Sequence, residues 1–196
     1  MNVLITDFIK NTSIEKKILG NYLKKTKKND VKILLVWHQL CDEKYLRQFP
    51  NLKLIIRYGV GYENISLNYI IKKKIKLANT PHYGLSEVSD TALSFLLSLT
   101  RKTYQYNFNL INKKKLPNDW QSQKINNIKR TSDYKVCSIG AGRIGSSFLI
   151  KAKSIGFQTF FYDPYVKSGQ DKILGAKKII NFEEIFETMD IISLHC

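Results

Sequence analysis

Three glycines in the second half of the sequence have the spacing of a phosphate-binding turn. An apolar run at 136–139 is followed by a G-x-G-x-x-G pattern at Gly140, Gly142 and Gly145. Gly140 would turn the chain tightly out of a strand, Gly142 would leave room for a pyrophosphate, and Gly145 would let the next helix pack close to the sheet. The helix N-terminus would offer free N–H groups and a positive dipole end to the phosphates.

An acidic residue follows this turn at the distance that a nucleotide requires. Asp163 lies 23 residues beyond Gly140 and directly after a second apolar run at 159–162. A carboxylate about 20 residues after the first glycine accepts hydrogen bonds from ribose hydroxyls. Glycine-rich turns are common, and the Asp163-Pro164 pair also favours a simple turn. The order of strand, helix and acid favours dinucleotide binding.

Composition limits the class of protein. The chain has 196 residues, 43% of them hydrophobic and 24% charged, which suits one large or two small globular domains. No apolar run reaches the ~18 residues of a membrane span, and no signal peptide is evident, so we expect a cytoplasmic protein without a membrane partner. Cys41, Cys137 and Cys196 are far apart and show no C-x-x-C spacing, which predicts reduced thiols and no metal site.

The net charge of +16 is high enough to suggest nucleic-acid binding. The lysines, however, form scattered clusters at 24–28, 72–74, 113–115 and 177–178. Several of these clusters fall at expected helix ends or loops, where solvated surface is the simpler interpretation. We therefore expect no specific nucleic-acid partner.

Short apolar runs alternate with helical patterns, which predicts an α/β fold with parallel sheets covered on both faces. The expected strands are 3–6, 33–36, 54–56, 75–78, 136–139, 159–162, 178–180 and 191–194, and the expected shorter helices begin near 13, 43, 67, 144 and 182. A long helix is expected from an N-cap at Ser86, with a buried face made of Val88, Ala92, Phe95, Leu96 and Leu99. It could continue past Leu110 and bridge two units.

Four segments resemble the D-isomer-specific 2-hydroxyacid dehydrogenases, which include phosphoglycerate dehydrogenases and the C-terminal-binding-protein corepressors. They are LKLIIRYGVGYENI at 52–65, NTPHYG with EVSD at 79–90, GAGRIG at 140–145 and YDPY at 162–165. The resemblance implies a flavodoxin-like substrate domain at 1–100 and a Rossmann NAD-binding domain at 101–196. Only the first half of the second domain would be present, and the active site would lie in the cleft between the domains.

The same resemblance assigns roles to residues. Val60 and Gly61 would present N–H groups to the carboxylate of a 2-keto or 2-hydroxy acid, with Val60 also near the nicotinamide. The residues that would contact the rest of the cofactor are Gly140, Gly142, Arg143, Ile144 and Gly145 at the pyrophosphate, Asp163 at the ribose, and His195 and Cys196 on the adenosine side. Because a carboxylate at 163 would repel a 2′-phosphate, NAD is expected rather than NADP.

The family's catalytic arginine, glutamate and histidine lie downstream of the strand at 191–194, so no catalytic residue is assigned. We expect the N-terminal part of an NAD-dependent dehydrogenase; the alternative is a non-catalytic truncated remnant or an NAD-binding or assembly module. Gly84 replaces an asparagine of some members, which leaves the substrate open. The strand at 191–194 would be an unprotected edge, so the chain alone is expected to associate or to be poorly soluble, and to bind NAD weakly.

Several other histidine, arginine and tyrosine residues could be taken for catalytic or binding residues, but a structural role is the simpler interpretation for most of them. His38 is interpreted as a loop or edge histidine, and His195 is not the family's proton donor. His82 falls in a loop that faces the cleft by resemblance, and either a loop role or a substrate contact fits it. Arg57 is expected to be structural or electrostatic, and Tyr58 and Tyr62 to pack. A homodimer contact through the long helix is a further implication of the resemblance.

Overall fold

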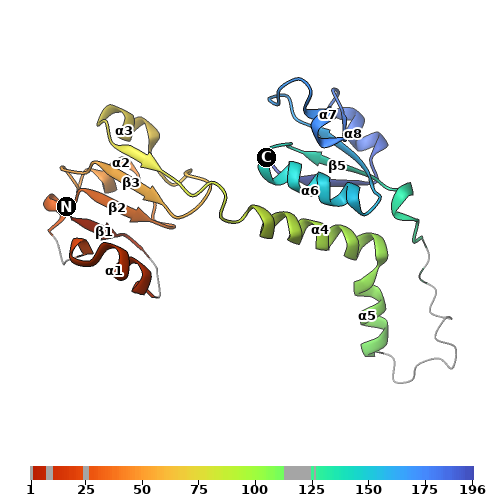
Figure 1. The fold of residues 1–196 in the computed structure, drawn as a ribbon, viewed down its shortest axis with the longest axis horizontal. Helices are drawn as coiled ribbons and strands as arrows, with labels where there is room; N and C mark the ends of the chain where they lie inside the picture. The colour runs from red at the N-terminus through yellow and green to blue at the C-terminus, as the bar shows by residue number, and fades with distance from the viewer. Residues whose placement is uncertain (1, 8–10, 24–26, 113–124, 126) are drawn as a thin grey trace. The chain divides into compact units, whose positions relative to one another are not determined.

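Each half of the chain folds around its own four-stranded parallel sheet (Figure 1). The computed structural model describes residues 2–7, 11–23, 27–112, 125 and 127–196. Its contacts group the chain into two compact units, Met1–Tyr83 and Gly84–Cys196. The helix α4 (Leu85–Arg101) belongs to the second unit because it packs against α6 (Arg143–Ser154), so this division falls before the one expected near residue 100.

The sheet of the first unit has the order β1-β2-β3-β4 with all neighbours parallel. Figure 1 shows α1 on one side of this sheet and α2 and α3 on the other. The elements are β1 (Val3–Ile5), α1 (Ser13–Leu19), the 3-10 turns Gly20–Leu23 and Lys28–Asp30, β2 (Ile33–Val36), α2 (Glu43–Leu46), β3 (Leu54–Arg57), α3 (Leu67–Lys72) and β4 (Lys76–Ala78).

Apolar side chains on both faces explain why these strands are continuous hydrophobic runs. Every residue of β2 is buried, and its side chains alternate between two clusters. Leu34 packs with Leu46 and Ile70 under α2 and α3, whereas Ile33 packs with Leu19 on the α1 side. The first unit therefore has a covered sheet with a core on each face.

The sheet of the second unit has the order β7-β6-β5-β8, also parallel throughout. In chain order this is 3-2-1-4, the first four strands of a Rossmann sheet. The elements are α4, α5 (Thr103–Asn112), the 3-10 turn Thr131–Asp133, β5 (Lys135–Ile139), α6, β6 (Gln158–Tyr162), α7 (Gln170–Leu174), β7 (Lys177–Lys178), α8 (Glu183–Thr188) and β8 (Ile191–Leu194). The expectation of parallel α/β sheets is confirmed.

Two expectations about the ends of the long helix are wrong. Its N-cap is Gly84, and Ser86 lies inside the first turn without capping it. It ends at Arg101 because Lys102 adopts a left-handed conformation with φ of 56°, after which α5 begins as a separate helix. Any continuation past Asn112 falls on residues outside those that the structure describes.

The apolar face of α4 is only partly covered. Leu96 is buried, whereas Val88, Phe95 and Leu99 are 47%, 65% and 52% exposed. The helix turns one side toward α6, and the side bearing Phe95 faces an open groove beside β8. The expectation that this whole face of α4 is buried is therefore wrong. Within the described part of the chain, no helix is long and apolar enough to span a membrane.

Candidate functional site

The turn from β5 into α6 has the backbone that the glycine spacing predicts. Gly140 has φ of +93°, a conformation that glycine adopts without strain. A Cβ there would lie 2.5 Å from the His195 carbonyl oxygen. The Gly140 N–H donates to the Tyr162 carbonyl at 2.9 Å, which ties the turn to β6. The chain leaves the sheet where the ends of β5, β6 and β8 meet.

The other two glycines have opposite surroundings. A Cβ on Gly145 would lie 2.1 Å from the Gly140 carbonyl oxygen, so α6 approaches the turn as closely as its backbone allows. A Cβ on Gly142, the N-cap of α6, would have no heavy atom within 4 Å. The open side of the turn is therefore at Gly142, where the free N–H groups of a helix N-terminus attract an anion.

Asp163 lies against this turn. Its Oδ2 accepts a hydrogen bond from the Ala141 N–H at 2.9 Å, and its Oδ1 accepts one from the Tyr165 N–H at 2.8 Å. The carboxylate thus stands at the carboxyl end of β6, beside the backbone that precedes Gly142. The strand order explains this proximity, because β6 is the neighbour of β5.

The order of the strands also creates a crevice. β6 and β8 lie on opposite sides of β5, so the connection that follows β5 leads to one side of this strand and the connection that follows β7 leads back to its other side. In parallel α/β sheets a ligand binds at such a switch point, outside the carboxyl ends of the strands. The chain reaches this point again at His195, whose N–H donates to the Ile139 carbonyl at 2.8 Å.

His195 is fixed in the fold rather than free. Its ring lies 5.1 Å from the Phe148 ring, centroid to centroid, and its Nε2 is 2.9 Å from the Ser193 hydroxyl. Burial lowers the pKa of His195 below its usual value, because the charged ring would lose its hydration there. Cys196 beside it is exposed. At α6, Arg143 is exposed and Ile144 half-buried.

The loop after β3 belongs to the first unit. Val60 is 37% exposed, and its carbonyl accepts a hydrogen bond from the Asn79 side-chain amide at 2.8 Å. The Thr80 N–H donates to the Gly59 carbonyl at 3.1 Å, so the loops after β3 and β4 hold one another. Val60 and Gly61 therefore lie at the carboxyl edge of this sheet.

Of the remaining residues named from the sequence, Arg57 and Tyr58 are held within the first unit, whereas Tyr62, which was expected to pack, is 44% exposed. Arg57 donates to the Tyr58 carbonyl and, at 3.3 Å, to the Asn64 side chain, so it braces its own loop. Burial raises the pKa of the Tyr58 hydroxyl to about 12. The other side chains named from the sequence, His38, Tyr62 and His82, are exposed. Among the described residues, no cluster of histidines, cysteines and acids could hold a metal ion.

Sequence reasoning missed two polar residues that shape the loops. The buried Ser138 hydroxyl donates to the Gly140 carbonyl at 2.6 Å and so holds the glycine turn. Asp7, after β1, accepts from Thr6 Oγ1 and from the backbone N–H groups of 37–39 after β2. A polar residue inside an apolar strand is a signal for Ser138. The partners of Asp7 lie about thirty residues away, and no local pattern reveals them.

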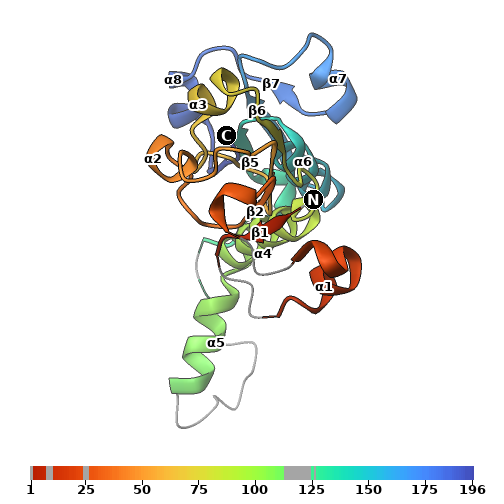
Figure 2. The ribbon, with the colours of Figure 1, turned by 90° about the vertical axis from the view of Figure 1, so that its left-hand side faces the viewer.

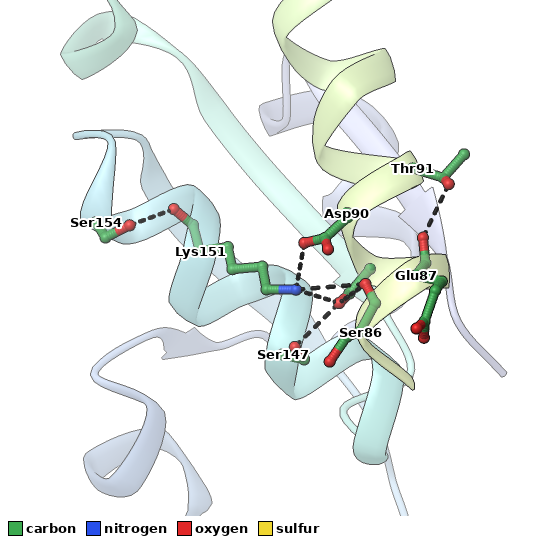
Figure 3. A network of polar contacts seen from close by, with 8 residues as sticks. Ser86, Glu87, Asp90, Thr91, Ser147, Lys151 and Ser154 are labelled. Atoms are coloured by element: carbon green, nitrogen blue, oxygen red, sulfur yellow. Dashed lines mark hydrogen bonds and ion pairs between the residues drawn. The ribbon is translucent and has the colours of Figure 1, made fainter. Parts of the chain in front are cut away.

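The position of α6 is fixed by a polar cluster on its α4 side (Figure 3). Lys151 Nζ lies 2.6 Å from an Asp90 carboxylate oxygen and 2.6 Å from the hydroxyl of the buried Ser89. The Ser89 hydroxyl also donates to the Ser86 carbonyl and lies 3.1 Å from the Ser147 hydroxyl. The helix that carries Gly142 at its start is thus anchored to α4.

Comparison with known proteins identifies the second unit. Residues 93–196 match the family described as D-isomer specific 2-hydroxyacid dehydrogenase, NAD binding domain. C-terminal-binding protein 1 of Caenorhabditis elegans is 30% identical over 170 residues, which is 86% of this chain and 23% of that protein. Glyoxylate reductase of Thermococcus litoralis is 26% identical over 185 residues, 90% of this chain and 53% of the relative. The chain thus spans about half the length, or less, of these relatives.

Solved structures share the fold over the whole chain. D-lactate dehydrogenase from Aquifex aeolicus, complexed with NAD and lactic acid, gives a TM-score of 0.82 at 22% identity and covers 100% of this chain and 60% of its own. The TT0316 protein from Thermus thermophilus gives 0.77 at 19% identity, covering 100% and 65%. At these identities the likeness shows the fold.

Proposed function

The chain belongs to the D-isomer-specific 2-hydroxyacid dehydrogenase family, and from that premise we propose that it forms the nucleotide-binding part of an oxidoreductase acting on small D-2-hydroxy acids and 2-keto acids. The cofactor is NAD, in agreement with the family domain that residues 93–196 match. The observation that carries the proposal is the open N-cap at Gly142 with the Asp163 carboxylate beside it.

The residues of the turn fit the two polar parts of this cofactor. The N–H groups at the start of α6 would hold the pyrophosphate, since Gly142 places no side chain in their way. Asp163 would accept hydrogen bonds from the ribose hydroxyls, and its negative charge would disfavour a 2′-phosphate. His195 and Cys196 would line the adenosine side. When bound, NAD accepts or supplies a hydride at its nicotinamide ring.

The substrate class is proposed from the first unit and from the relatives. The loop at Val60 and Gly61 would receive the substrate carboxylate through backbone N–H groups. Two of the proteins compared above carry glyoxylate or lactic acid in their names, a 2-keto acid and a 2-hydroxy acid. We propose further that the family's arginine, glutamate and histidine have no counterpart among these 196 residues, so that this segment would bind the nucleotide without turning over a substrate.

A non-catalytic NAD-binding or assembly module is the second candidate. It is favoured by the 30% identity to a relative that is named as a binding protein, C-terminal-binding protein 1. Oxidation of NADH with hydroxypyruvate, glyoxylate or pyruvate separates the candidates when it is measured on the longest polypeptide encoded with this segment. A homodimer and a cytoplasmic location are predictions of both candidates.

The test of the nucleotide site is Gly142→Val, with Gly84→Val as its matched control. Both glycines are helix N-caps of the second unit with negative φ, −70° at Gly142 and −117° at Gly84, so neither position has the left-handed conformation that requires glycine. Only the side chain at 142 would occupy the place of the pyrophosphate. We expect weak NADH binding by the unchanged chain, a loss of tenfold or more (about 1.4 kcal/mol) in Gly142→Val, and no change in Gly84→Val, measured by calorimetric titration.

The thermal unfolding midpoint of each variant serves as the check on folding. Equal NADH affinity in both valine variants would refute the assignment of the cofactor to this turn. A second titration compares NADPH with NADH in Asp163→Ser, which removes the carboxylate. We expect the preference for NADH to disappear, and an unchanged preference would remove Asp163 from the ribose site.

A further inference from the structure

A second concave site lies within the first unit, between α2 and α3. The cavity has a volume of about 510 Å³. This is within the range of about 300–1,000 Å³ that small-molecule sites occupy. It is lined by Glu43, Arg47, Phe49, Pro50, Leu52, Lys53, Tyr69, Lys72, Lys73 and Ile75. The lysine cluster at 72–74, interpreted from the sequence as solvated surface, thus contributes to a hollow.

The cavity is separate from the carboxyl edge of its sheet. Lys53 directly precedes β3 and Ile75 directly precedes the first residue of β4, so both mark the amino ends of parallel strands. The Val60 loop follows the opposite, carboxyl end of β3. The cavity therefore differs from the loops proposed for substrate, and it contains no residue of the nucleotide turn.

The elements that surround the cavity are packed into the core of the first unit. Phe49 and Leu52 are 3% and 4% exposed and belong to the same core cluster as Ile70 of α3. The starts of the two helices are joined, because the Cys41 N–H donates to the Asn64 carbonyl at 2.7 Å and the Ser66 N–H to the Cys41 carbonyl at 3.0 Å. The charged side chains at the rim therefore project from elements that hold a fixed spacing.

The charge of the lining is strongly positive. Four cations, Arg47, Lys53, Lys72 and Lys73, surround a single carboxylate. Arg47 pairs with Glu43 through both Nε and Nη2. Within the described part of the chain, the three lysines have no ion-pair partner. A concave surface with charges of one sign focuses the field and concentrates counter-ions.

The Glu43 carboxylate shows that this cavity stabilises a negatively charged group. The Arg47 hydrogen bond and the positive charges of Lys72 and Lys73 lower the pKa of Glu43 below its usual value. An oxyanion held among these cations is thus stabilised. One carboxylate leaves three positive charges uncompensated, which a ligand with several negative charges would balance better than a monoanion.

We propose that the cavity between α2 and α3 binds a small polyanion of the diphosphate type, with Arg47, Lys72 and Lys73 contacting its phosphoryl oxygens. In the free protein Arg47 is hydrogen-bonded to Glu43, so the Glu43 carboxylate would compete with the ligand for the Arg47 guanidinium. The half-buried Tyr69 and the exposed Pro50 form a less polar wall that would contact an organic group attached to the phosphates.

The test uses the 196-residue chain and inorganic pyrophosphate, followed by two-dimensional ¹H–¹⁵N NMR. We expect saturable amide shifts at 43–47 and 69–75, with affinity falling from pyrophosphate to orthophosphate to acetate. The double variant Lys72→Gln/Lys73→Gln should weaken binding at least fivefold. The matched control, Lys16→Gln/Lys17→Gln, removes the same charge from the exposed residues of α1 and should leave the affinity unchanged.

Glu43→Gln gives a change in the opposite direction. Because it frees Arg47, it should tighten pyrophosphate binding at least twofold. Shifts confined to 140–145 would mean that pyrophosphate binds only at the nucleotide turn and would overturn the proposal without affecting that turn. Equal weakening by the two lysine double variants, or preferential binding of a single-stranded oligonucleotide, would show diffuse attraction to a basic surface and would also overturn it. Circular dichroism melting checks that each variant is folded.

Discussion

At the scale of single residues, Asp7 shows how one carboxylate can order two loops. It accepts hydrogen bonds from the Trp37 and Gln39 N–H groups at 2.9 Å each, and it also accepts the His38 N–H and the Thr6 hydroxyl. Burial opposes its ionisation, but these hydrogen bonds to the charged form lower its pKa below the usual value. The carboxyl ends of β1 and β2 are joined through this one side chain.

Asp7→Asn should therefore destabilise the first unit in a pH-dependent way. We expect a loss of about 1–3 kcal/mol in the free energy of unfolding at pH 7, since the charged acceptor is removed. A carboxyl whose folded pKa lies below its unfolded value of about 3.9 stabilises the fold above that pH and ceases to do so as pH falls through the folded pKa. Urea unfolding of both proteins should thus show a difference that is full near pH 7 and shrinks below pH ~4. A constant difference would contradict this.

Substitution by alanine should lower the free energy of unfolding at Gly145 but change it little at Gly142, three residues earlier. Gly145→Ala would place its Cβ 2.1 Å from the Gly140 carbonyl oxygen, so α6 would have to move. We expect a loss of about 1–3 kcal/mol, as for overpacked sites. Gly142→Ala meets open space and should change stability by less than about 1 kcal/mol. Urea unfolding followed by circular dichroism measures both, and equal losses would show that α6 is not packed as closely as described.

The sequence predicted the backbone geometry of this turn well, because the spacing of the glycines is a local pattern. Gly140, Gly142 and Gly145 act through their own backbone geometry, so their spacing alone carries the information. Asp163 was selected by its distance along the chain, but its hydrogen bond to the Ala141 N–H was not predicted, because this depends on β6 lying beside β5. Asp7 could not be predicted for the same reason.

At the scale of elements, α4 is held on α6 by Lys151 (Figure 3). The Lys151 side chain is 29% exposed, whereas its partner Asp90 is 63% exposed, so solvent screens part of the ion pair. Lys151→Met keeps the length of the side chain but removes the charge and the hydrogen bond to Ser89. We expect a loss of about 1 kcal/mol in stability.

Lys172→Met is the control for this change. Lys172 is 88% exposed, and the one ion pair it forms with the described residues is at 4.0 Å to the adjacent Asp171, so its loss should change stability by less than about 0.5 kcal/mol. Urea unfolding at low and high salt compares the two variants. A Lys151→Met variant as stable as the control would mean that apolar contacts alone hold α4 in place.

The open side of β8 predicts association. In the described residues β8 pairs only with β5, and Leu194 beside the groove under α4 is 69% exposed. An unpaired, apolar edge is a template for pairing with another chain, and a lysine on such an edge discourages it. We expect the 196-residue chain to elute larger than a monomer in size-exclusion chromatography with light scattering, and Leu194→Lys to shift it toward the monomer. A monodisperse, unchanged monomer would contradict this expectation.

The strands were predictable almost residue by residue, but the ends and faces of α4 were not. Strands buried on both faces are continuous apolar runs, and β2 and β8 have the predicted bounds. The predicted helix extended past Arg101 because residues 103–112 also form a helix. The break between the two helices was not predicted, because the left-handed residue there is Lys102 and not a glycine. The exposure of Phe95 depends on tertiary packing beside β8, and a local sequence pattern carries no information about that packing.

At the scale of the whole molecule, two units with separate cores should lose structure separately. The clusters around Leu34 and around Phe148 contain no residue in common. The three cysteines provide one reporter for each unit and one reference. Cys41 is buried in the first unit, Cys137 is buried in β5 of the second, and Cys196 is exposed.

Thiol reactivity should therefore report each unit by itself. Burial raises the pKa of Cys41 to about 12 and that of Cys137 to about 11, so neither forms a thiolate near neutral pH while it is folded. Only Cys196 should react quickly with a maleimide in the native protein. With increasing urea, Cys41 and Cys137 should become reactive at different midpoints, which mass spectrometry of the labelled peptides resolves.

NADH then tests where the nucleotide binds, because a ligand stabilises only the unit whose folded form it recognises. At 100 times its Kd a ligand adds about 2.7 kcal/mol to that unit. We expect saturating NADH to raise the urea midpoint at which Cys137 reacts and to leave the midpoint of Cys41 unchanged. The Gly142→Val variant serves as the control, since it should abolish the shift at Cys137. An equal shift at both cysteines would mean that the two units unfold together or share the site, and a shift at Cys41 alone would place the nucleotide in the first unit.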